Sequence, residues 1–283
     1  MPTVTLNGAT FVYDDIGDED ADVIVALHGG RGIGDRRGEF SAYKALSDNY
    51  RLIAYDQRGC GETSLTPPYT CEQFADDVEA FRQNLCGGRK IILLGGSFGG
   101  MIALTYAVRH PEGLSRLILR GTAASHHNED DAFVTFKQRL HKAPSASVRM
   151  LEKLFSDQVK DDMELRLIWL ALQPLYYENF DPDAALERTR TMHLHAETHN
   201  ALFAERIYDV RDQLKDIAVP TLVICGAEDW ICPPNHSRLI AEKIPNAELL
   251  EVPGANHAVH IEANDVVVAA VRDFLARTQP SQS

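Results

Sequence analysis

Short apolar runs alternate with longer amphipathic stretches along most of the chain. Most of these runs are almost entirely aliphatic, as expected of strands in a parallel sheet whose two faces are both covered by helices. We therefore predict buried strands at residues 23–27, 52–55, 91–94, 117–119, 221–225 and 248–252.

The stretches between these strands show the periodicity of amphipathic helices. Helices are expected at residues 71–85, 101–110, 237–243 and 266–276. The chain opens instead with two short segments, residues 3–6 and 10–13, around Asn7-Gly8, a pair that favours the tight turn of a β-hairpin. Alternation of strands and helices predicts an α/β fold with a mostly parallel, doubly wound sheet.

One region interrupts this alternation. From Ala123 to Lys215 no segment has the pattern of a strand, and helical patterns dominate, including residues 164–172 and 182–195. Asp181 is a favourable N-cap for the second of these helices, with Pro182 at its first position. We predict a helical cap at residues 123–215, inserted between two segments of one α/β core, residues 1–122 and 216–283.

Composition narrows the classes of function. The chain has 283 residues, of which 45% are hydrophobic, enough to bury a large core. Lys and Arg number 28 against 41 Asp and Glu, which gives a net charge of −13. Because such a chain is repelled by phosphate backbones and anionic lipids, we expect neither a nucleic-acid partner nor a membrane.

Targeting signals and cysteine spacing bear on location. The N-terminal residues lack the basic start and apolar run of a signal peptide, and no apolar stretch is long enough to span a bilayer. The five cysteines are scattered, without the spacing of disulfide frameworks or zinc sites. We therefore expect a cytoplasmic protein, and the sequence does not predict its oligomeric state.

Residues 95–99 read Gly-Gly-Ser-Phe-Gly and fit the G-x-S-x-G pattern of a nucleophile elbow. The motif directly follows one predicted strand and directly precedes a predicted helix, as a sharp strand-to-helix turn requires. Glycines leave room for the crowded backbone, and amides at the helix N-terminus point toward the reacting oxygen. We predict that Ser97 is a catalytic nucleophile.

A serine nucleophile requires a base, and the base requires a group that orients it. In this architecture they follow in the order serine, acid, histidine. Asp229 and His257 each come shortly after a predicted strand, so both are expected at the same sheet edge as Ser97. We predict Asp229 as the acid and His257 as the base. The adjacent Glu228 is the alternative acid, and His260 is the alternative histidine.

Catalysis by such a serine also requires N–H donors for the oxyanion of the tetrahedral intermediate. We predict the backbone N–H of Phe98, immediately after the nucleophile, as one donor. The other is expected in the glycine-rich loop that begins at His28 and follows the strand at residues 23–27. Gly30 is our choice and Gly29 the alternative, whereas His28 is expected to be structural.

These motifs resemble those of the α/β-hydrolase superfamily. More narrowly, three of them resemble the proline iminopeptidase group, which carries a His-Gly-Gly-Pro-Gly loop, an Asp-Gln-Arg-Gly-x-Gly turn and a Gly-Gly-Ser-x-Gly elbow. The matching segments here are residues 28–30, 56–61 and 95–99. The resemblance implies an α/β-hydrolase fold with a helical cap. This chain departs from the group at Arg31, where the loop of the family has proline.

The resemblance also implies residues that bind substrate. Proline iminopeptidases use acidic residues of the cap to bind the free amine of the substrate, and residues 197–199, Glu-Thr-His, resemble the Glu-x-His stretch that supplies one of them. Glu197 is therefore a candidate, although it also fits a solvated helix face, and Glu178 is a candidate for the second acid. Trp230 is a candidate for lining the pocket.

We thus predict a serine hydrolase that forms an acyl-enzyme intermediate and acts on a small peptide or amide, as proline iminopeptidases do. The alternative is a carboxylesterase or lactonase, and a ligand receptor or a lyase on the same fold stays open. No cofactor is implied and no metal is expected, because His193, His195 and His199 lack Asp or Cys at ligand spacing. The expected partner is a small-molecule or short-peptide substrate.

Overall fold

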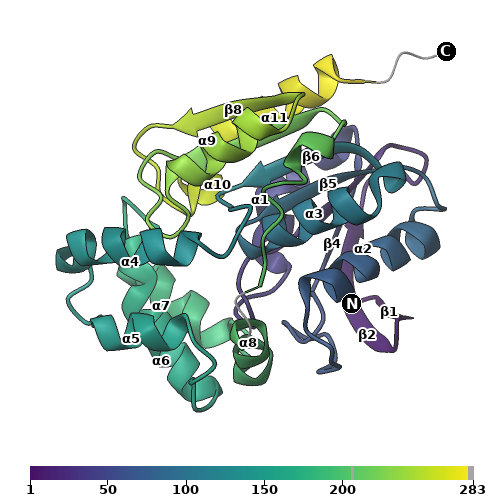
Figure 1. Ribbon diagram of the computed structural model, residues 1–283. Coiled ribbons are helices and arrows are strands. Elements are labelled where there is room, and N and C mark those ends of the chain that lie inside the picture. Colours follow the sequence, from purple (N-terminus) through teal and green to yellow (C-terminus); the bar gives the residue numbers. More distant parts are fainter. Residues whose placement is uncertain (205–206, 280–283) are drawn as a thin grey trace.

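A computed structural model describes residues 1–204 and 207–279 (Figure 1). Its centre is one eight-stranded sheet in the order β1-β2-β4-β3-β5-β6-β7-β8. The pairs β1/β2 and β2/β4 are antiparallel and all other neighbours are parallel, which confirms the predicted α/β class and its mostly parallel sheet. The strands are β1 (Thr3–Leu6), β2 (Ala9–Ile16), β3 (Val23–Leu27), β4 (Arg51–Tyr55), β5 (Ile91–Gly96), β6 (Leu114–Arg120), β7 (Thr221–Gly226) and β8 (Ala247–Val252).

The N-terminal hairpin turns where the sequence predicts it. Asn7 and Gly8 have φ angles of 46° and 78°, which a two-residue turn of type I′ requires at both central positions. β2 continues past the hairpin and pairs with β4, so the hairpin extends the parallel sheet at one edge.

Helices cover both faces of the sheet and bury two apolar clusters against it. On one face lie α2 (Cys71–Leu85), α3 (Phe98–Arg109) and α9 (Pro234–Lys243), and on the other α1 (Arg37–Tyr43) and α11 (Asn264–Arg277). In α2 the buried residues Phe74, Val78 and Phe81 recur at helical spacing, and Thr70 caps the first turn through its hydroxyl. Shorter elements are η1 (Lys44–Asp48), η2 (Pro111–Gly113), η5 (Leu214–Asp216) and α10 (Val259–Glu262).

A group of helices separates β6 from β7 and gathers to one side of the sheet (Figure 1). Their side chains form a third apolar cluster of their own. Between β6 and β7 the described residues contain only isolated β-bridges and no strand, and no described helix is long and apolar enough to cross a membrane. The helices are α4 (Asn128–Arg139), η3 (Leu140–Lys142), α5 (Val148–Leu154), α6 (Asp162–Leu172), η4 (Gln173–Tyr176), α7 (Pro182–Thr191) and α8 (Ala196–Phe203). The exact boundaries of a cap at residues 123 and 215 stay a prediction.

The prediction of one helix over residues 182–195 is wrong at its C-terminal end. The carboxylate of Asp181 caps α7 as expected, accepting hydrogen bonds from the N–H groups of residues 183 and 184. The helix nevertheless ends at Thr191, because Met192 turns to extended backbone and Leu194 forms a β-bridge with Ile33. A tertiary contact therefore overrides the helical pattern here.

Candidate active site

Ser97 occupies the sharp turn between β5 and α3. Its φ of 53° and ψ of −120° place it in a sparsely populated region that costs a non-glycine residue about 1–3 kcal/mol. Two hydrogen bonds hold this geometry, one from the Ser97 N–H to the Arg120 carbonyl (2.8 Å) and one from the Thr122 hydroxyl to the Ser97 carbonyl (2.7 Å). A Cβ atom at Gly99 would collide with the carbonyl oxygen of Leu27, so the glycine after Phe98 is required for the close approach of α3 to β3.

The side chains of Asp229 and His257 meet at the end of β7 and β8. Nδ1 of His257 lies 2.8 Å from Oδ2 of Asp229, and both residues are buried. The other carboxylate oxygen accepts hydrogen bonds from the N–H groups of Ile231 (3.0 Å) and Cys232 (2.9 Å). Since a carboxylate only accepts, Nδ1 of His257 carries the hydrogen and Nε2 keeps a lone pair that can take a proton.

The two alternative residues have other environments. The Glu228 carboxylate is about half exposed and pairs with Arg139 of α4 at 2.5 Å, so it faces away from His257. His260 lies on α10, and Nδ1 of His260 has no hydrogen-bond partner among the described residues. Burial, together with the nearby charge of Arg120, holds the pKa of His260 well below its usual value. The geometry therefore favours Asp229 as the acid and His257 as the base.

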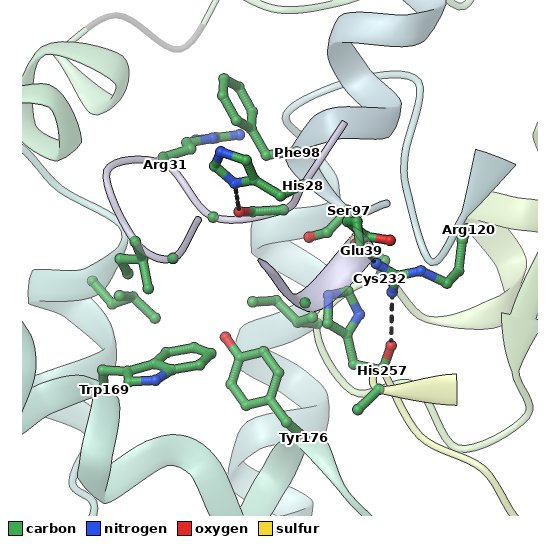
Figure 2. Close-up of a pocket in the computed structure, with 18 of the residues that line it drawn as sticks. His28, Arg31, Glu39, Ser97, Phe98, Arg120, Trp169, Tyr176, Cys232 and His257 are labelled. Carbon is green, nitrogen blue, oxygen red and sulfur yellow. Dashed lines mark hydrogen bonds and ion pairs between the residues drawn. The ribbon is translucent and has the colours of Figure 1, made fainter. Parts of the chain in front are cut away.

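Ser97 and His257 open onto one cavity of about 260 Å³ (Figure 2). Trp169 and Tyr176 face Arg31 and Phe98 across it, as Figure 2 shows. The edge of Tyr176 packs on the His257 ring with centroids 5.5 Å apart, so helices between β6 and β7 form one wall of the site. The apolar part of the lining includes Met101, Leu154, Phe155, Met192, Phe203 and Ile231.

The glycine-rich loop after β3 forms the wall next to the nucleophile. A Cβ atom at Gly29 would lie 2.9 Å from the Cβ of Ser97, and Gly30 has a φ of 86°, which favours glycine. Among the described residues, neither the Gly30 N–H nor the Phe98 N–H donates a hydrogen bond. His28 uses both ring nitrogens within the fold: Nδ1 donates to the Gly29 carbonyl (2.8 Å) and Nε2 accepts from the Gln57 N–H (3.2 Å).

α8 holds this loop in place. The imidazole of His199 contacts the Arg31 carbonyl through Nδ1 at 3.0 Å, and the His195 N–H donates to the Gly32 carbonyl at 2.8 Å. Burial lowers the pKa of His199 to about 4, so its ring is neutral at pH 7. Arg31 pairs with Glu129 at 2.9 Å and lies 4.2 Å over the Phe203 ring, so its side chain joins this loop to α4 and α8.

None of the three predicted substrate-binding residues lines the cavity. The Glu197 side chain is exposed and accepts a hydrogen bond from Tyr69 at 3.3 Å. Trp230 is completely buried and lies behind Tyr176, with ring centroids 5.4 Å apart. The Glu178 carboxylate accepts a hydrogen bond from Asn256 and forms ion pairs with Arg139 and Lys142.

Two groups at the site were missed in the sequence. Asn256 is completely buried, and its side-chain oxygen accepts from the N–H groups of His257 (2.8 Å) and Trp230 (3.3 Å). Arg120 donates to the His257 carbonyl (3.3 Å) and forms a buried ion pair with Glu39 (2.5 Å). Asn256 could have been noticed as the neighbour of His257, whereas no local signal joins Arg120 to Glu39, 81 residues away.

The three neighbouring histidines have separate partners. Nε2 of His195 contacts the Gly61 carbonyl at 2.8 Å, Nδ1 of His193 lies 3.6 Å from Asp35, and His199 contacts Arg31. Within residues 1–204 and 207–279 no group of three or more His, Cys, Asp or Glu side chains is arranged to hold a metal ion.

Comparison with known proteins identifies the family. The model of the alpha/beta hydrolase fold family matches residues 22–264. The chain belongs to this family. As an α/β-hydrolase it is 45% identical to the proline iminopeptidase PfmaB of Pestalotiopsis fici, over 97% of this chain and 99% of that relative. It is also 29% identical to a proline iminopeptidase of Lactobacillus helveticus, over 89% of both chains. This hydrolase therefore resembles proline iminopeptidases.

Solved structures share the fold of this hydrolase. The enol-lactonase of Burkholderia xenovorans superimposes with a TM-score of 0.78 at 25% identity, over 97% of this chain and all of that one. A meta-cleavage product hydrolase of Pseudomonas fluorescens superimposes with a TM-score of 0.79 at 21% identity, over 99% and 98% of the two chains. The second likeness concerns the fold alone.

Proposed function

We propose that the chain is a serine hydrolase in which Ser97, His257 and Asp229 act as a catalytic triad. The observation that carries the proposal is the 2.8 Å contact between His257 Nδ1 and the buried Asp229 carboxylate, with Ser97 and His257 on one cavity. Asp229 orients the imidazole and stabilises its charged form, which leaves Nε2 to accept the Ser97 proton. The strained turn at Ser97 exposes the hydroxyl to substrate.

The proposed reaction is a two-step acyl transfer. The Ser97 oxygen attacks the substrate carbonyl as His257 takes its proton, and the N–H groups of Phe98 and Gly30 stabilise the oxyanion. His257 then protonates the leaving group, which departs as the ester of Ser97 forms. Water, deprotonated by the same His257, attacks this ester and releases the acid.

The first candidate substrate is a short peptide or amide with a free N-terminus. It is supported by the 45% identity to a relative named a proline iminopeptidase. The predicted amine contact at Glu197 gives it no support, because that carboxylate lies outside the cavity lining.

The second candidate substrate is a small ester or lactone. The likeness to an enol-lactonase supports it, as does the charge state of the cavity wall. Among the described lining residues each carboxylate already has a cationic partner, so none is left to bind an ammonium group. The pairs are Asp35 with Arg37, Glu39 with Arg120 and Glu129 with Arg31.

A paired assay on a prolyl anilide and a short-chain nitrophenyl ester tests this function. Hydrolysis of either substrate by the wild type, with none by Ser97→Ala, supports the triad and identifies the substrate class. Peptide mapping after reaction with a fluorophosphonate probe should place the label on Ser97 alone. A label on a different serine in active enzyme would refute the assignment.

A further inference from the structure

Among the described residues that line the cavity, one arginine has no ion-pair partner. Arg188, on α7, lines the same cavity as Ser97. Its guanidinium lies 4.9 Å over the Tyr177 ring and makes one long hydrogen bond, 3.4 Å, to the neutral side-chain oxygen of Gln173. No carboxylate among the described residues pairs with it, so all but one of its five N–H donors stay available.

The other charged side chains of the described lining all have ion-pair partners. Each remaining arginine or carboxylate of the described lining belongs to an ion pair of 2.9 Å or shorter. His199 and His260 are held neutral at pH 7, because burial lowers the pKa of both. Arg37, which pairs with Asp35, lies outside the lining. With Arg37 counted beside Asp35, Arg188 is the charged side chain of the described lining that has no counter-ion, inside a chain whose net charge is −13.

The surroundings of Arg188 are aromatic. Tyr177 lies under the guanidinium, and Trp169 packs edge-on against Tyr176 with ring centroids 4.7 Å apart. Trp169 and Tyr176 face the space beside Ser97 and His257 (Figure 2). A planar apolar group fits such walls, and a guanidinium at their margin presents parallel N–H groups to a carboxylate.

We propose that Arg188 binds a carboxylate carried by an apolar or aromatic substrate, with the ring or chain of that substrate against Trp169 and Tyr176. This proposal depends on the proposed function in one respect: the molecule that binds Arg188 is the substrate of Ser97. A single unpaired cation matches one negative charge, which a carboxylate supplies. The same cation repels the ammonium group that an aminopeptidase substrate would bring, so it favours carboxylate-bearing esters or lactones.

Binding tests the site independently of catalysis. Titration calorimetry on Ser97→Ala would compare 4-phenylbutyrate with 4-phenylbutyramide, which has nearly the same shape without the charge. We expect the carboxylate to bind at least about 10-fold more tightly, as a charge-assisted hydrogen bond implies. Adding Arg188→Gln should abolish this preference and leave the affinity for the amide unchanged, and adding Arg188→Lys should retain part of it.

Arg190 provides the matched control. It lies on the same helix and is largely exposed, with Glu187 as its partner, and it does not line the cavity. Arg190→Gln should keep the full preference for the carboxylate. Equal affinities of the carboxylate and the amide in the Ser97→Ala background, or an equal loss in Arg188→Gln and Arg190→Gln, would overturn the proposal.

Turnover separates failure of this site from failure of the proposed function. The butyrate esters of 4-hydroxybenzoate and of methyl 4-hydroxybenzoate differ only by the methyl group that removes the negative charge of the leaving group. Arg188→Gln should lower kcat/KM for the charged ester by about 10-fold or more relative to the neutral one. Turnover of both esters with no dependence on Arg188 and no binding preference refutes the carboxylate site alone. Carboxylate binding without turnover of any ester or anilide refutes the hydrolase mechanism alone.

Discussion

The strained backbone at Ser97 costs about 1–3 kcal/mol of stability. Such strain is typical of a residue whose side chain reacts. We predict that Ser97→Ala lowers kcat by at least about 10⁴-fold, because nucleophile, base and acid act as a unit. The unfolding midpoint should change little, since alanine keeps the same backbone constraint. Steady-state kinetics and thermal unfolding would check both. Residual activity above one percent would show that Ser97 is not the nucleophile.

Asp229 and Glu228 are adjacent carboxylates in different surroundings. Asp229 is buried against Nδ1 of His257, whereas Glu228 forms a partly exposed pair with Arg139. We predict that Asp229→Asn lowers kcat by about 10⁴-fold, through loss of the correct imidazole tautomer. Glu228→Gln, measured under identical conditions, should stay within a few-fold of wild type. Similar losses in the two variants would contradict the assignment.

Asn256 is a positioning residue. It joins the loop that carries Asp229, the loop that carries His257 and the segment after η4. Its side chain accepts from the backbone of Trp230 and His257 and donates to Glu178 at 2.7 Å. We predict that Asn256→Ala lowers kcat by about 10- to 100-fold with little change in KM, because the imidazole loses its alignment while the cavity persists.

Variants at Glu178 distinguish this positioning from general loss of structure. Glu178→Gln keeps an oxygen that can accept from Asn256, so it should retain most activity. Glu178→Ala removes the acceptor and should resemble Asn256→Ala in kcat. A parallel rise in KM and fall in thermal stability in all three variants would indicate a structural role only.

At the residue scale, the sequence predicts what is encoded locally. The elbow at Ser97 and the positions of Asp229 and His257 follow from the ends of strands, and the structure brings the last two into contact. The contact between Asn256 and Glu178 spans 78 residues and depends on how the helices between β6 and β7 pack on the core, which no local pattern reveals. Glu197 is the opposite case. Its local sequence matches the Glu-x-His stretch of proline iminopeptidases, yet its side chain does not line the cavity.

At the scale of elements, the core strands and the long helices that pack on the sheet follow their apolar periodicity, whereas the 12-residue α4 was not predicted. The predicted segments 23–27 and 71–85 coincide with β3 and α2. Short elements such as α1 and α8 were not predicted, because seven or eight residues give too little periodicity to distinguish a helix from a loop. The early end of α7 depends on the bridge between Leu194 and Ile33, a contact across 161 positions of the chain.

The junction between α8 and the loop after β3 makes stability depend on pH through His199. Its pKa is about 4 in the folded chain, against about 6.5 when unfolded. Between these values only the unfolded state takes up the proton, so the free energy of unfolding falls as pH drops from about 6.5 to about 4. The loss through this residue is on the order of 3 kcal/mol, at about 1.4 kcal/mol per pKa unit.

We predict that His199→Gln flattens this part of the pH profile, because glutamine keeps a donor for the Arg31 carbonyl but does not titrate. Urea unfolding of both proteins at pH 7 and at pH 4.5 gives the comparison. His141, which is exposed, supplies the control, and His141→Gln should leave the pH dependence unchanged. An identical pH dependence in wild type and His199→Gln would contradict the prediction.

At the scale of the whole molecule, the apolar interior is divided. Two clusters lie on the faces of the sheet, and the third lies among the helices between β6 and β7. The third cluster also takes in Ile33, from the loop after β3, and Trp230, next to Asp229. The helices between β6 and β7 therefore stabilise two loops that carry the candidate site, although they contribute no residue to the proposed triad.

This division predicts that activity is lost before the sheet unfolds. A separate apolar cluster with its own helices can open as a cooperative unit at lower free energy than the central strands. Hydrogen exchange measured by mass spectrometry at rising urea should therefore show α5, α6 and α7 losing protection before β3, β5 and β6. Because Trp230 packs in that cluster, its release should displace Asp229, so turnover of a neutral ester should fall together with protection of the helices. Loss of protection in helices and strands at the same urea concentration, or activity that persists until the strands exchange, would contradict this coupling.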